Sequence, residues 1–287
     1  MKKCYLVTGA SGFLGSHIAE FLIERKKKVI LFDIKRSKFF KKNFFVVGNL
    51  NNLQKLNKYT KNVNTIFHFA ATADLKEAND NPFITIENNV NGTLKLLQSA
   101  IKNKVKKIIF ASSVYAISEQ GGIYSTSKLT SEMLIEKICK KYKIKFVILR
   151  FGTVYGERAN KFNTVNNYIK LAKTKKKISR ESKGREVRSY IHVKDVVKLV
   201  FETTKKRYEN NYYNILGNKK YFVKDLFKII KENVPDLKIK FSKVDKRKYN
   251  YKVNPFTYKL REGLTIRLRK YISLEKGIKN LITKIKT

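Results

Sequence analysis

The sequence predicts an α/β protein built on a doubly wound parallel sheet, with a smaller mixed α/β region at its C-terminal end. Short apolar runs alternate with segments of helical spacing along the first half of the chain, and this alternation is typical of parallel strands joined by right-handed helical crossovers. A glycine-rich turn follows the first apolar run directly, and the alternation weakens after Gly156. We therefore expect a first domain at residues 1–156 and a second region at 157–287.

The strands and helices of the first domain follow from the spacing of its apolar residues. Short apolar runs bounded by turns are typical of buried strands, and apolar residues at intervals of three and four are typical of helices. We expect strands at 4–7, 29–32, 44–47, 65–69, 107–111 and 146–149. We expect helices at 14–25, 84–103 and 123–142. Pro82, just before the second of these, suits the first turn of a helix.

The region after Gly156 is predicted to be a mixture of short helices, turns and basic loops. Within it, segments 193–203 and 212–215 have the patterns of a helix and a strand, and we expect this stretch, near 190–216, to return to the first domain. An amphipathic helix is predicted around 274–285. Such a helix could bind a membrane surface, but packing into the core explains its apolar residues better. These residues are Leu274, Ile278, Leu281 and Ile285.

The charge of the chain is its most unusual property. A total of 64 Lys and Arg residues against 22 Asp and Glu residues gives a formal net charge of +42. Such an excess is a feature of proteins that bind nucleic acid. Here the lysines are spread along the chain together with many Asn, Ile, Phe and Tyr residues, as AT-rich codons would produce. We therefore expect compositional bias and no nucleic-acid partner.

No targeting or membrane segment is predicted. The apolar run at the N-terminus ends at Gly9, too early for the apolar region of a signal peptide. No stretch approaches the roughly 18 uncharged apolar residues that a membrane-spanning helix needs. Cys4 and Cys139 are the only cysteines, which fits a reducing compartment and offers no cluster of metal ligands. We expect a cytoplasmic protein with no membrane partner and no bound metal.

The segment TGASGFLG, at 8–15, predicts a phosphate-binding turn. Its glycines allow a tight turn, close approach of the backbone to a pyrophosphate, and close packing of the following helix. Asp33 ends the second predicted strand 24 residues after Gly9, where a carboxylate accepts a hydrogen bond from a ribose 2′-hydroxyl. These features predict a Rossmann-like dinucleotide site. The charge of Asp33 favours NAD over NADP, although Lys35 and Arg36 are close enough in sequence to reverse that preference.

A second motif predicts proton-transfer chemistry. Tyr124 and Lys128 stand at the head of a predicted helix, and their spacing of four places phenol and ammonium on one face. A cation about 4 Å away would lower the pKa of the phenol by roughly 3 units at an effective dielectric constant near 20. Desolvation would subtract part of this shift, and bound oxidised nicotinamide would add a second positive charge. We therefore expect Lys128 to bring the pKa of Tyr124 toward neutrality. Ser113 follows a predicted strand at its carboxyl end, where ligands bind in open parallel sheets, and it is the third predicted catalytic residue.

The ordered motifs resemble those of the extended short-chain dehydrogenase/reductases, the NAD-dependent epimerase/dehydratase family, over nearly the whole chain. The matching segments are TGASGFLG (8–15), FHFAA (67–71), ENNVNGTLKLL (87–97), IIFASS (108–113), YSTSK (124–128), LRFGTVYG (149–156) and RSYIHVKDVV (188–197). These matches in order are specific to the family and much less specific to a substrate.

The resemblance implies which residues bind NAD. The glycine-rich turn would hold the pyrophosphate, Asp33 the adenosine ribose, and the pair Asn49 and Leu50 the adenine, with Asn in place of the family's Asp. Asn88 would orient the site, and we expect Asn89 to be only a helix residue. The residues implied at the cofactor are Gly9, Ser11, Gly12, Phe13, Leu14, Gly15, Asp33, Asn49, Leu50, Phe69, Ala70, Ala71, Asn88, Tyr124 and Lys128.

The resemblance also implies the substrate site and its chemistry. Tyr124 would be the base, Lys128 its partner, and Ser113 the catalytic serine. The residues implied at the substrate are Ser113, Tyr124, Thr153 and Arg188. Arg188 would contact the nucleotide diphosphate.

Three departures from the family's pattern bear on the reaction. Val114 and Tyr115 stand where the family's dehydratases and decarboxylases carry acidic residues, which favours an epimerase or a ketone reductase. The segment 113–124 is shorter than in most members. Gly152 and Thr153 replace the Phe-Asn of many sugar epimerases, so the usual substrate amide is absent.

We therefore expect an NAD-dependent nucleotide-sugar epimerase that acts at C4 of a UDP-hexose through a transient 4-keto sugar. One alternative is an NAD(P)H-dependent nucleotide-sugar reductase that makes a 4- or 6-deoxy sugar. Another is a non-catalytic NAD-binding protein with RNA or another anionic partner. A homodimer, the family's usual assembly, is expected through helices 84–103 and 123–142, with Leu134 and Ile138 predicted to be exposed.

Overall fold

The computed structural model describes residues 3–40, 45–118, 120–242 and 263–285. Its centre is an eight-stranded sheet of order β14-β11-β6-β5-β4-β1-β2-β3, in which all neighbouring strands are parallel. The strands are β1 (Cys4–Thr8), β2 (Lys28–Asp33), β3 (Phe45–Val47), β4 (Thr65–His68), β5 (Lys107–Ser113), β6 (Lys145–Phe151), β11 (Asn211–Ile215) and β14 (Leu264–Thr265). The predicted strands of the first domain are confirmed, apart from Phe44, which lies outside the described residues.

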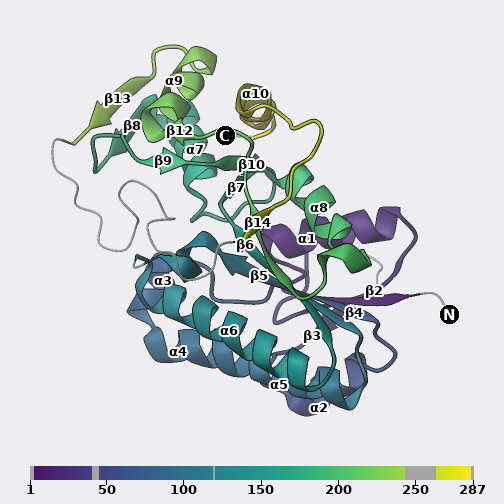
Figure 1. The fold of residues 1–287 in the computed structure, drawn as a ribbon. Helices are drawn as coiled ribbons and strands as arrows, with labels where there is room; N and C mark the ends of the chain where they lie inside the picture. The colour runs from purple at the N-terminus through teal and green to yellow at the C-terminus, as the bar shows by residue number, and fades with distance from the viewer. Residues whose placement is uncertain (1–2, 41–44, 119, 243–262, 286–287) are drawn as a thin grey trace.

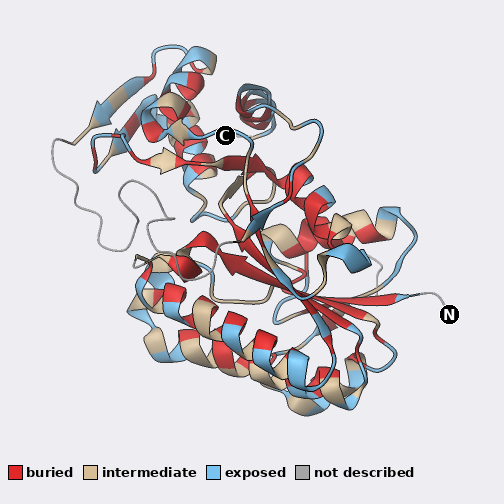
Figure 2. Cartoon of the chain, in the orientation of Figure 1, coloured by how far each residue is buried: buried red, intermediate tan, exposed pale blue. Residues whose placement is uncertain are grey.

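Helices cover both faces of this sheet, as a doubly wound fold requires (Figure 1). On one face, α1 (Phe13–Glu24) and α8 (Val193–Glu202) pack against the sheet in one hydrophobic cluster. On the other face, α2 (Leu53–Tyr59), α5 (Gly92–Lys102) and α6 (Gly122–Lys141) pack in a second cluster. The strands between them are mostly buried along their length (Figure 2), which explains why they have continuous apolar runs.

The predicted helix 84–103 is interrupted. It consists of α4 (Pro82–Ile86), a π-helical turn η1 (Glu87–Asn91) and α5, with Pro82 in its first turn as expected. A further helix, α3 (Leu75–Asp80), precedes it. Single π-helical turns inside α-helices are frequent at functional sites, and this one carries Asn88 and Asn89.

The second region forms a separate hydrophobic cluster beside the carboxyl ends of the strands. Its helices are α7 (Thr164–Lys175), α9 (Val223–Asn233) and α10 (Leu274–Lys284). Its two-stranded pairs are β7 (Thr153–Tyr155) with β10 (Tyr190–His192), β9 (Val187–Arg188) with β12 (Tyr221–Phe222), and β8 (Lys177–Arg180) with β13 (Lys238–Phe241). Leu274, Ile278 and Leu281 are buried in this cluster, so the core packing predicted for the last helix is confirmed. None of the described helices is long and apolar enough to cross a membrane.

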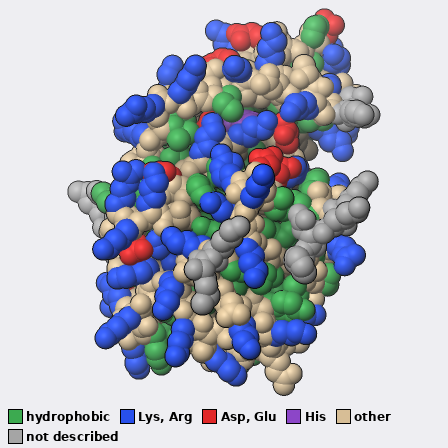
Figure 3. Space-filling model, turned by 90° about the vertical axis from the view of Figure 1, so that its right-hand side faces the viewer, with side chains coloured by type: hydrophobic (Ala, Val, Ile, Leu, Met, Phe, Trp, Pro, Cys, Tyr) green, Lys and Arg blue, Asp and Glu red, His purple; other side chains and the backbone are tan. Residues whose placement is uncertain are grey.

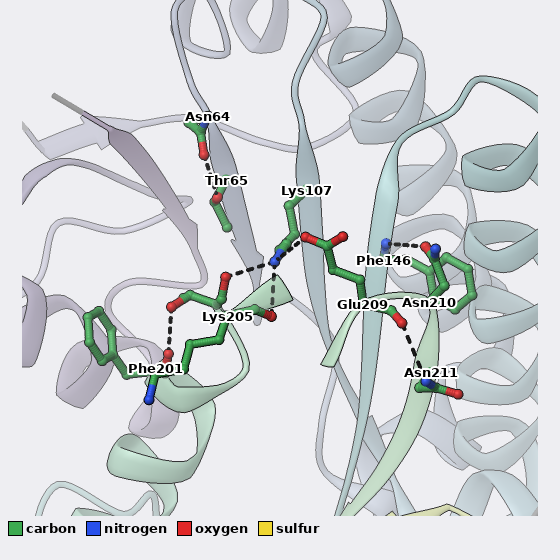
Figure 4. Close-up of polar contacts among 10 residues, drawn as sticks. Asn64, Thr65, Lys107, Phe146, Phe201, Lys205, Glu209, Asn210 and Asn211 are labelled. Atoms are coloured by element: carbon green, nitrogen blue, oxygen red, sulfur yellow. Dashed lines mark hydrogen bonds and ion pairs between the residues drawn. The ribbon is translucent and has the colours of Figure 1, made fainter. Parts of the chain in front are cut away.

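Helix α8 and strand β11, which follow the first segments of the second region, lie with the elements of the large sheet. Helix α8 lies beside α1, and β11 pairs with β6 so that Tyr213 is opposite Leu149. The connection between them, which includes a short 3₁₀ turn (Lys206–Tyr208), is held at the amino end of β5 by Lys107. The Lys107 ammonium donates to the carbonyl of Thr204 at 2.8 Å and forms an ion pair with Glu209 at 2.8 Å (Figure 4).

The basic side chains do not gather in one stripe on the face that Figure 3 shows. Lys and Arg are scattered over that whole face and interrupted by neutral and apolar groups. A nucleic-acid site would instead concentrate them along a groove or one helix. The distribution on this face supports compositional bias as the origin of the charge.

Candidate active site

The glycine-rich turn leaves no space for a side chain at Gly9 or Gly15. Gly9 has φ of 72°, and a Cβ placed on it would lie 2.6 Å from the amide nitrogen of Ala70. A Cβ on Gly15 would lie 2.1 Å from the carbonyl oxygen of Gly9. Helix α1 begins directly after Gly12, and no side chain caps its first amide groups. The turn therefore presents amide donors and the positive end of the helix dipole, which fits a pyrophosphate.

Asp33 lies at the carboxyl end of β2, beside this turn. Its carboxylate accepts hydrogen bonds from the amide of Ser11 at 2.9 Å and from the amide of Lys35 at 3.3 Å. The hydroxyl of Ser11 donates to the carbonyl of Lys35 at 2.5 Å. Asp33 is half-buried, whereas Lys35 and Arg36 are exposed. The carboxylate is therefore fixed at the edge of the turn, beside the amide groups that the turn presents.

The remaining residues predicted at the cofactor lie at the ends of neighbouring strands. Phe69 and Ala70 follow β4 and are half-buried, and the ring of Phe69 lies 6.3 Å from that of Phe151. Leu50 is buried in the core, whereas Asn49 is exposed and its side-chain oxygen accepts from the amide of Asn51 at 2.9 Å. Ala71 is half-buried next to Ala70. The residues present fit a dinucleotide laid across the carboxyl edge of the sheet.

A buried histidine that the sequence analysis did not single out contacts Thr8, the residue at which the glycine-rich turn begins. His68 ends β4, and its two ring nitrogens lie 2.8 Å from the hydroxyl of Thr8 and 2.9 Å from the hydroxyl of Thr93. Burial, together with the charge of Lys128, lowers the pKa of His68 to about 3. His68 is therefore neutral, and it links β1 to the start of α5. Its position in the segment FHFAA was the signal available in the sequence.

The structure brings Tyr124, Lys128 and Ser113 close together. Tyr124 lies in the first turn of α6 and shares a side-chain hydrogen bond with Ser113 at the end of β5. The Lys128 ammonium donates to the carbonyl of Ala111 at 2.8 Å and lies 6.0 Å from the centre of the Tyr124 ring. Both β5 and β6 extend two residues beyond their predicted ends, and for this reason Ser113 belongs to the strand itself.

The electrostatics of this group differ from the expectation. Burial raises the pKa of Tyr124 to about 12, and the hydrogen bond to Ser113 opposes this only in part. Burial lowers the pKa of Lys128 to about 8, against the charge of Glu132. Desolvation of both side chains therefore outweighs the attraction between them, and the ammonium of Lys128 does not by itself bring the pKa of Tyr124 near neutrality. The phenol needs further positive charge to become a base at neutral pH.

Asn89, expected to be only a helix residue, links three parts of the site. It is buried in η1, and its side-chain oxygen accepts from the amide of Thr72 at 2.7 Å. Its side-chain nitrogen donates to the hydroxyl of Ser127 on α6 at 2.9 Å. Asn88 is half-buried and donates to the hydroxyl of Thr72 at 3.2 Å. Asn89 therefore does more than continue the helix, because it connects η1 to Thr72 and to Ser127 of α6.

A cavity of about 720 Å³ opens at the carboxyl ends of the strands. Ser113, Tyr124, Thr153 and Arg188, the residues predicted at the substrate, all line it. Arg180, which the sequence analysis missed, also lines it and forms an ion pair with Glu186 at 2.9 Å. This volume is typical of small-molecule sites.

Among the residues that the structure describes, those that follow Ser113 in the cavity wall carry no carboxyl group. Val114 and Tyr115 begin a short 3₁₀ turn (Val114–Ile117), and both line the cavity. The ring of Tyr115 lies edge-on to that of Tyr124, with 6.4 Å between the ring centres. The acidic residues of the lining are Asp74 and Glu181, and Asp74 already accepts from the amide of Glu77 as the N-cap of α3.

Comparison with known proteins decides the family. The NAD dependent epimerase/dehydratase family matches residues 5–215. The chain belongs to this family. It is therefore an enzyme, and NAD is its cofactor.

Curated proteins that are similar to this chain include epimerases of sugar nucleotides. The chain is similar to a putative UDP-glucose 4-epimerase of Methanocaldococcus jannaschii, with 30% identity over 262 residues that cover 80% of this chain and 82% of the relative. It is similar to a UDP-glucuronate 4-epimerase of Thermodesulfobacterium geofontis, with 26% identity that covers 68% of this chain and 69% of the relative.

Solved structures agree in fold. The UDP-glucose 4-epimerase of Thermotoga maritima, crystallised with UDP-glucose, has a TM-score of 0.80 and 25% identity and covers 98% of this chain and 97% of its own. The UDP-N-acetylglucosamine 4-epimerase of Methanobrevibacter ruminantium M1 has a TM-score of 0.83 at 22% identity and covers 99% of this chain and 98% of its own. The second similarity concerns the fold alone.

Proposed function

We propose that this enzyme is a nucleotide-sugar epimerase that acts at C4 of a UDP-hexose. The observation that carries the proposal is the meeting of Tyr124, Lys128 and Ser113 at one wall of the 720 Å³ cavity, with Val114 and Tyr115 in place of acidic neighbours. The curated relatives named as 4-epimerases of UDP-glucose and UDP-glucuronate support this substrate class.

The residues of the chain divide the binding task between them. The amides of the turn from Gly9 to Gly15 would hold the pyrophosphate of NAD, and Asp33 would hold the adenosine ribose. Arg188, buried and at the cavity wall, neutralises the diphosphate of the substrate. Thr153 offers a hydroxyl to the sugar. We propose that residues 1–156, with the returning stretch near 190–216, bind NAD and that the rest of 157–287 mainly binds the substrate.

Tyr124 moves the proton in this reaction. Its phenolate removes the proton of the C4 hydroxyl, and Ser113 donates a hydrogen bond to the same oxygen. NAD, when bound, would supply the oxidising equivalent, a reversible acceptor for the hydride of C4. Tyr124 would return the proton to the C4 oxygen after the 4-keto sugar has turned its other face toward the cofactor. Lys128, held at the carbonyl of Ala111, keeps a positive charge beside the phenolate.

A homodimer completes the proposed assembly. Leu134 and Ile138, predicted to be exposed, are half-buried. Other apolar side chains on α4 and α6 reach the solvent. Phe83 and Ile84 on α4 are 87% and 58% exposed, and Met133 on α6 is 46% exposed. Helices α4 and α6 lie against one another, so these side chains offer a surface for the same two helices of a second copy. The unpaired thiols of Cys4 and Cys139 support a reducing, cytoplasmic location.

One assay tests the proposed activity. The protein is incubated with NAD and with UDP-, dTDP- and GDP-sugars in turn, while isomerisation and NADH absorbance are followed together. We expect isomerisation of a UDP-hexose with no net change in NADH. Stoichiometric consumption of NADH or NADPH would identify a reductase instead. Binding of NAD with no turnover of any sugar would favour the non-catalytic alternative.

A further inference from the structure

A fully buried ion pair lies directly behind the candidate catalytic residues. Glu132 is on α6, one turn beyond Lys128, and Arg150 is on β6. Their side chains are 1% and 0% exposed. Arg150 donates from Nε to one carboxylate oxygen at 2.9 Å and from Nη2 to the other at 2.7 Å. The contact is therefore bidentate, which fixes the orientation of both groups.

Neighbouring side chains join this pair to two further strands. The hydroxyl of Ser112 on β5 donates to Oε1 of Glu132 at 2.5 Å. The ring of Tyr212 on β11 covers the guanidinium of Arg150, with 4.8 Å between the guanidinium carbon and the ring centre. One carboxylate on α6 is thus connected to β5 and β6, and through Arg150 to β11.

Stability alone does not explain a charged pair at this place. Apolar side chains of similar volume often stabilise a core as well as a buried ion pair does, because desolvation of both charges offsets their attraction. What the pair adds is geometry, since two parallel hydrogen bonds permit only one axial and rotational position of α6 against β6. At about 1.5 Å per residue, Tyr124 lies roughly 12 Å from Glu132 along the same helix, so the pair determines where the phenol lies.

The hydrogen bond from Ser112 to Glu132 fixes β5, the strand that carries Ala111 and Ser113. Ser112 stands between Ala111, whose carbonyl accepts from Lys128, and Ser113, whose side chain is bonded to Tyr124. A displacement of β5 relative to α6 would change both contacts at once. The carboxylate of Glu132 therefore fixes the position of α6 relative to β5 and β6, the two strands that end at the reacting groups.

We propose that Glu132, Arg150 and Ser112 are positioning residues that hold Tyr124 and Lys128 of α6 in register with the ends of β5 and β6. They touch neither substrate nor cofactor and act through the catalytic residues. This proposal rests on the proposed function, because turnover is its main readout.

The test replaces the pair without leaving a buried charge. In Glu132→Leu/Arg150→Met both charges are removed together, and the variant should keep the thermal unfolding midpoint of the wild type. We expect kcat to fall about 10²-fold, because a displacement of about 1 Å at a reacting group has that cost. The KM for the nucleotide sugar should change little, since the cavity wall at Arg188 and Thr153 is not part of the network.

A matched control removes a second, largely inaccessible ion pair, between Lys107 on β5 and Glu209 in the connection before β11. Lys107 and Glu209 meet at the amino end of β5, away from the cavity, with side chains 8% and 17% exposed. The double variant Lys107→Met/Glu209→Leu should therefore retain the kcat of the wild type. A folded Glu132→Leu/Arg150→Met enzyme with unchanged kcat would overturn the proposal, as would an equal loss of kcat in the control.

Two further measurements keep the proposal testable in every case. If the double variant does not fold, Ser112→Ala removes one bond to Glu132 and should lower kcat by roughly three- to ten-fold, and unchanged kcat would contradict the proposal. If the wild type isomerises no sugar, the proposed function fails on its own. The crystal structure of the double variant then decides: a Lys128 ammonium displaced from the carbonyl of Ala111 supports positioning, and an unchanged contact overturns it.

Discussion

The charge of Lys128 should set the pH range in which Tyr124 accepts a proton, and Lys128→Met tests this. The ammonium lies 6.0 Å from the centre of the Tyr124 ring, and both side chains are buried. Because burial lowers the pKa of Lys128 to about 8, the ammonium still carries its charge at neutral pH. At this separation and an effective dielectric constant near 20, one charge stabilises the phenolate by about 2.8 kcal/mol, or roughly 2 pKa units.

The direction of the effect follows from the charge that is removed. Without the cation the pKa of the phenol rises, so a smaller fraction of Tyr124 is ionised at any fixed pH. The rising limb of the activity profile should move up by as much as about 2 pH units, and turnover near neutral pH should fall by as much as roughly 100-fold. Turnover is measured across the pH range at saturating NAD, on the nucleotide sugar that the panel identifies.

A second variant separates this effect from a general loss of charge. Lys137 is exposed on the same helix, so Lys137→Met makes the same chemical change away from the site and should leave the profile unchanged. Thermal unfolding shows whether each variant is folded. A folded Lys128→Met enzyme with the turnover and pH profile of the wild type would refute the role of Lys128.

Three other predictions follow from the site and its surface. Tyr124→Phe should lower turnover about 10²- to 10⁴-fold while NAD still binds, and Ser113→Ala should have a smaller effect; near wild-type turnover of a folded Tyr124→Phe protein would show that Tyr124 is not the base. Asp33→Asn should weaken NAD binding by roughly 1.5 to 3 kcal/mol in calorimetry and relax discrimination against NADP, and unchanged affinity for both cofactors would exclude Asp33 as the ribose ligand. The wild type should be a dimer by light scattering at micromolar concentration, and Met133→Glu should shift it toward monomer; a monomeric wild type would contradict the proposed interface.

The parts of the fold that repeat a local pattern were predictable from the sequence. The buried strands have continuous apolar runs, and the glycine-rich turn stands between a strand and a helix, so the doubly wound sheet followed directly. The interruption of the helix at Glu87–Asn91 was not predictable. A π-helical turn holds one residue more than an α-helical turn, and the types of amino acid in it do not reveal this. For the same reason Asn89 was assigned to the helix alone.

The candidate site was predictable in its residues and less so in its energetics. Spacing placed Tyr124 and Lys128 on one helical face, but it could not show that both would be fully desolvated. Burial depends on what the other strands and helices contribute, and here it moves the pKa of Tyr124 up and that of Lys128 down. The ion pair of Glu132 and Arg150 was invisible for a related reason, because its two residues come from separate elements.

The type of reaction depends on how many groups at the cavity can move a proton. Elimination of a hydroxyl needs a donor for the leaving oxygen in addition to the base, whereas epimerisation at C4 uses one group that takes a proton and returns it. Beside Ser113 the available side chains are Val114 and Tyr115, and a phenol with an ordinary pKa near 10 is a weak acid. Asp74 is engaged as the cap of α3. Glu181, the other acidic residue of the described lining, follows β8 rather than β5, so the end of β5 offers Tyr124 as the group that moves the proton in the proposed epimerisation.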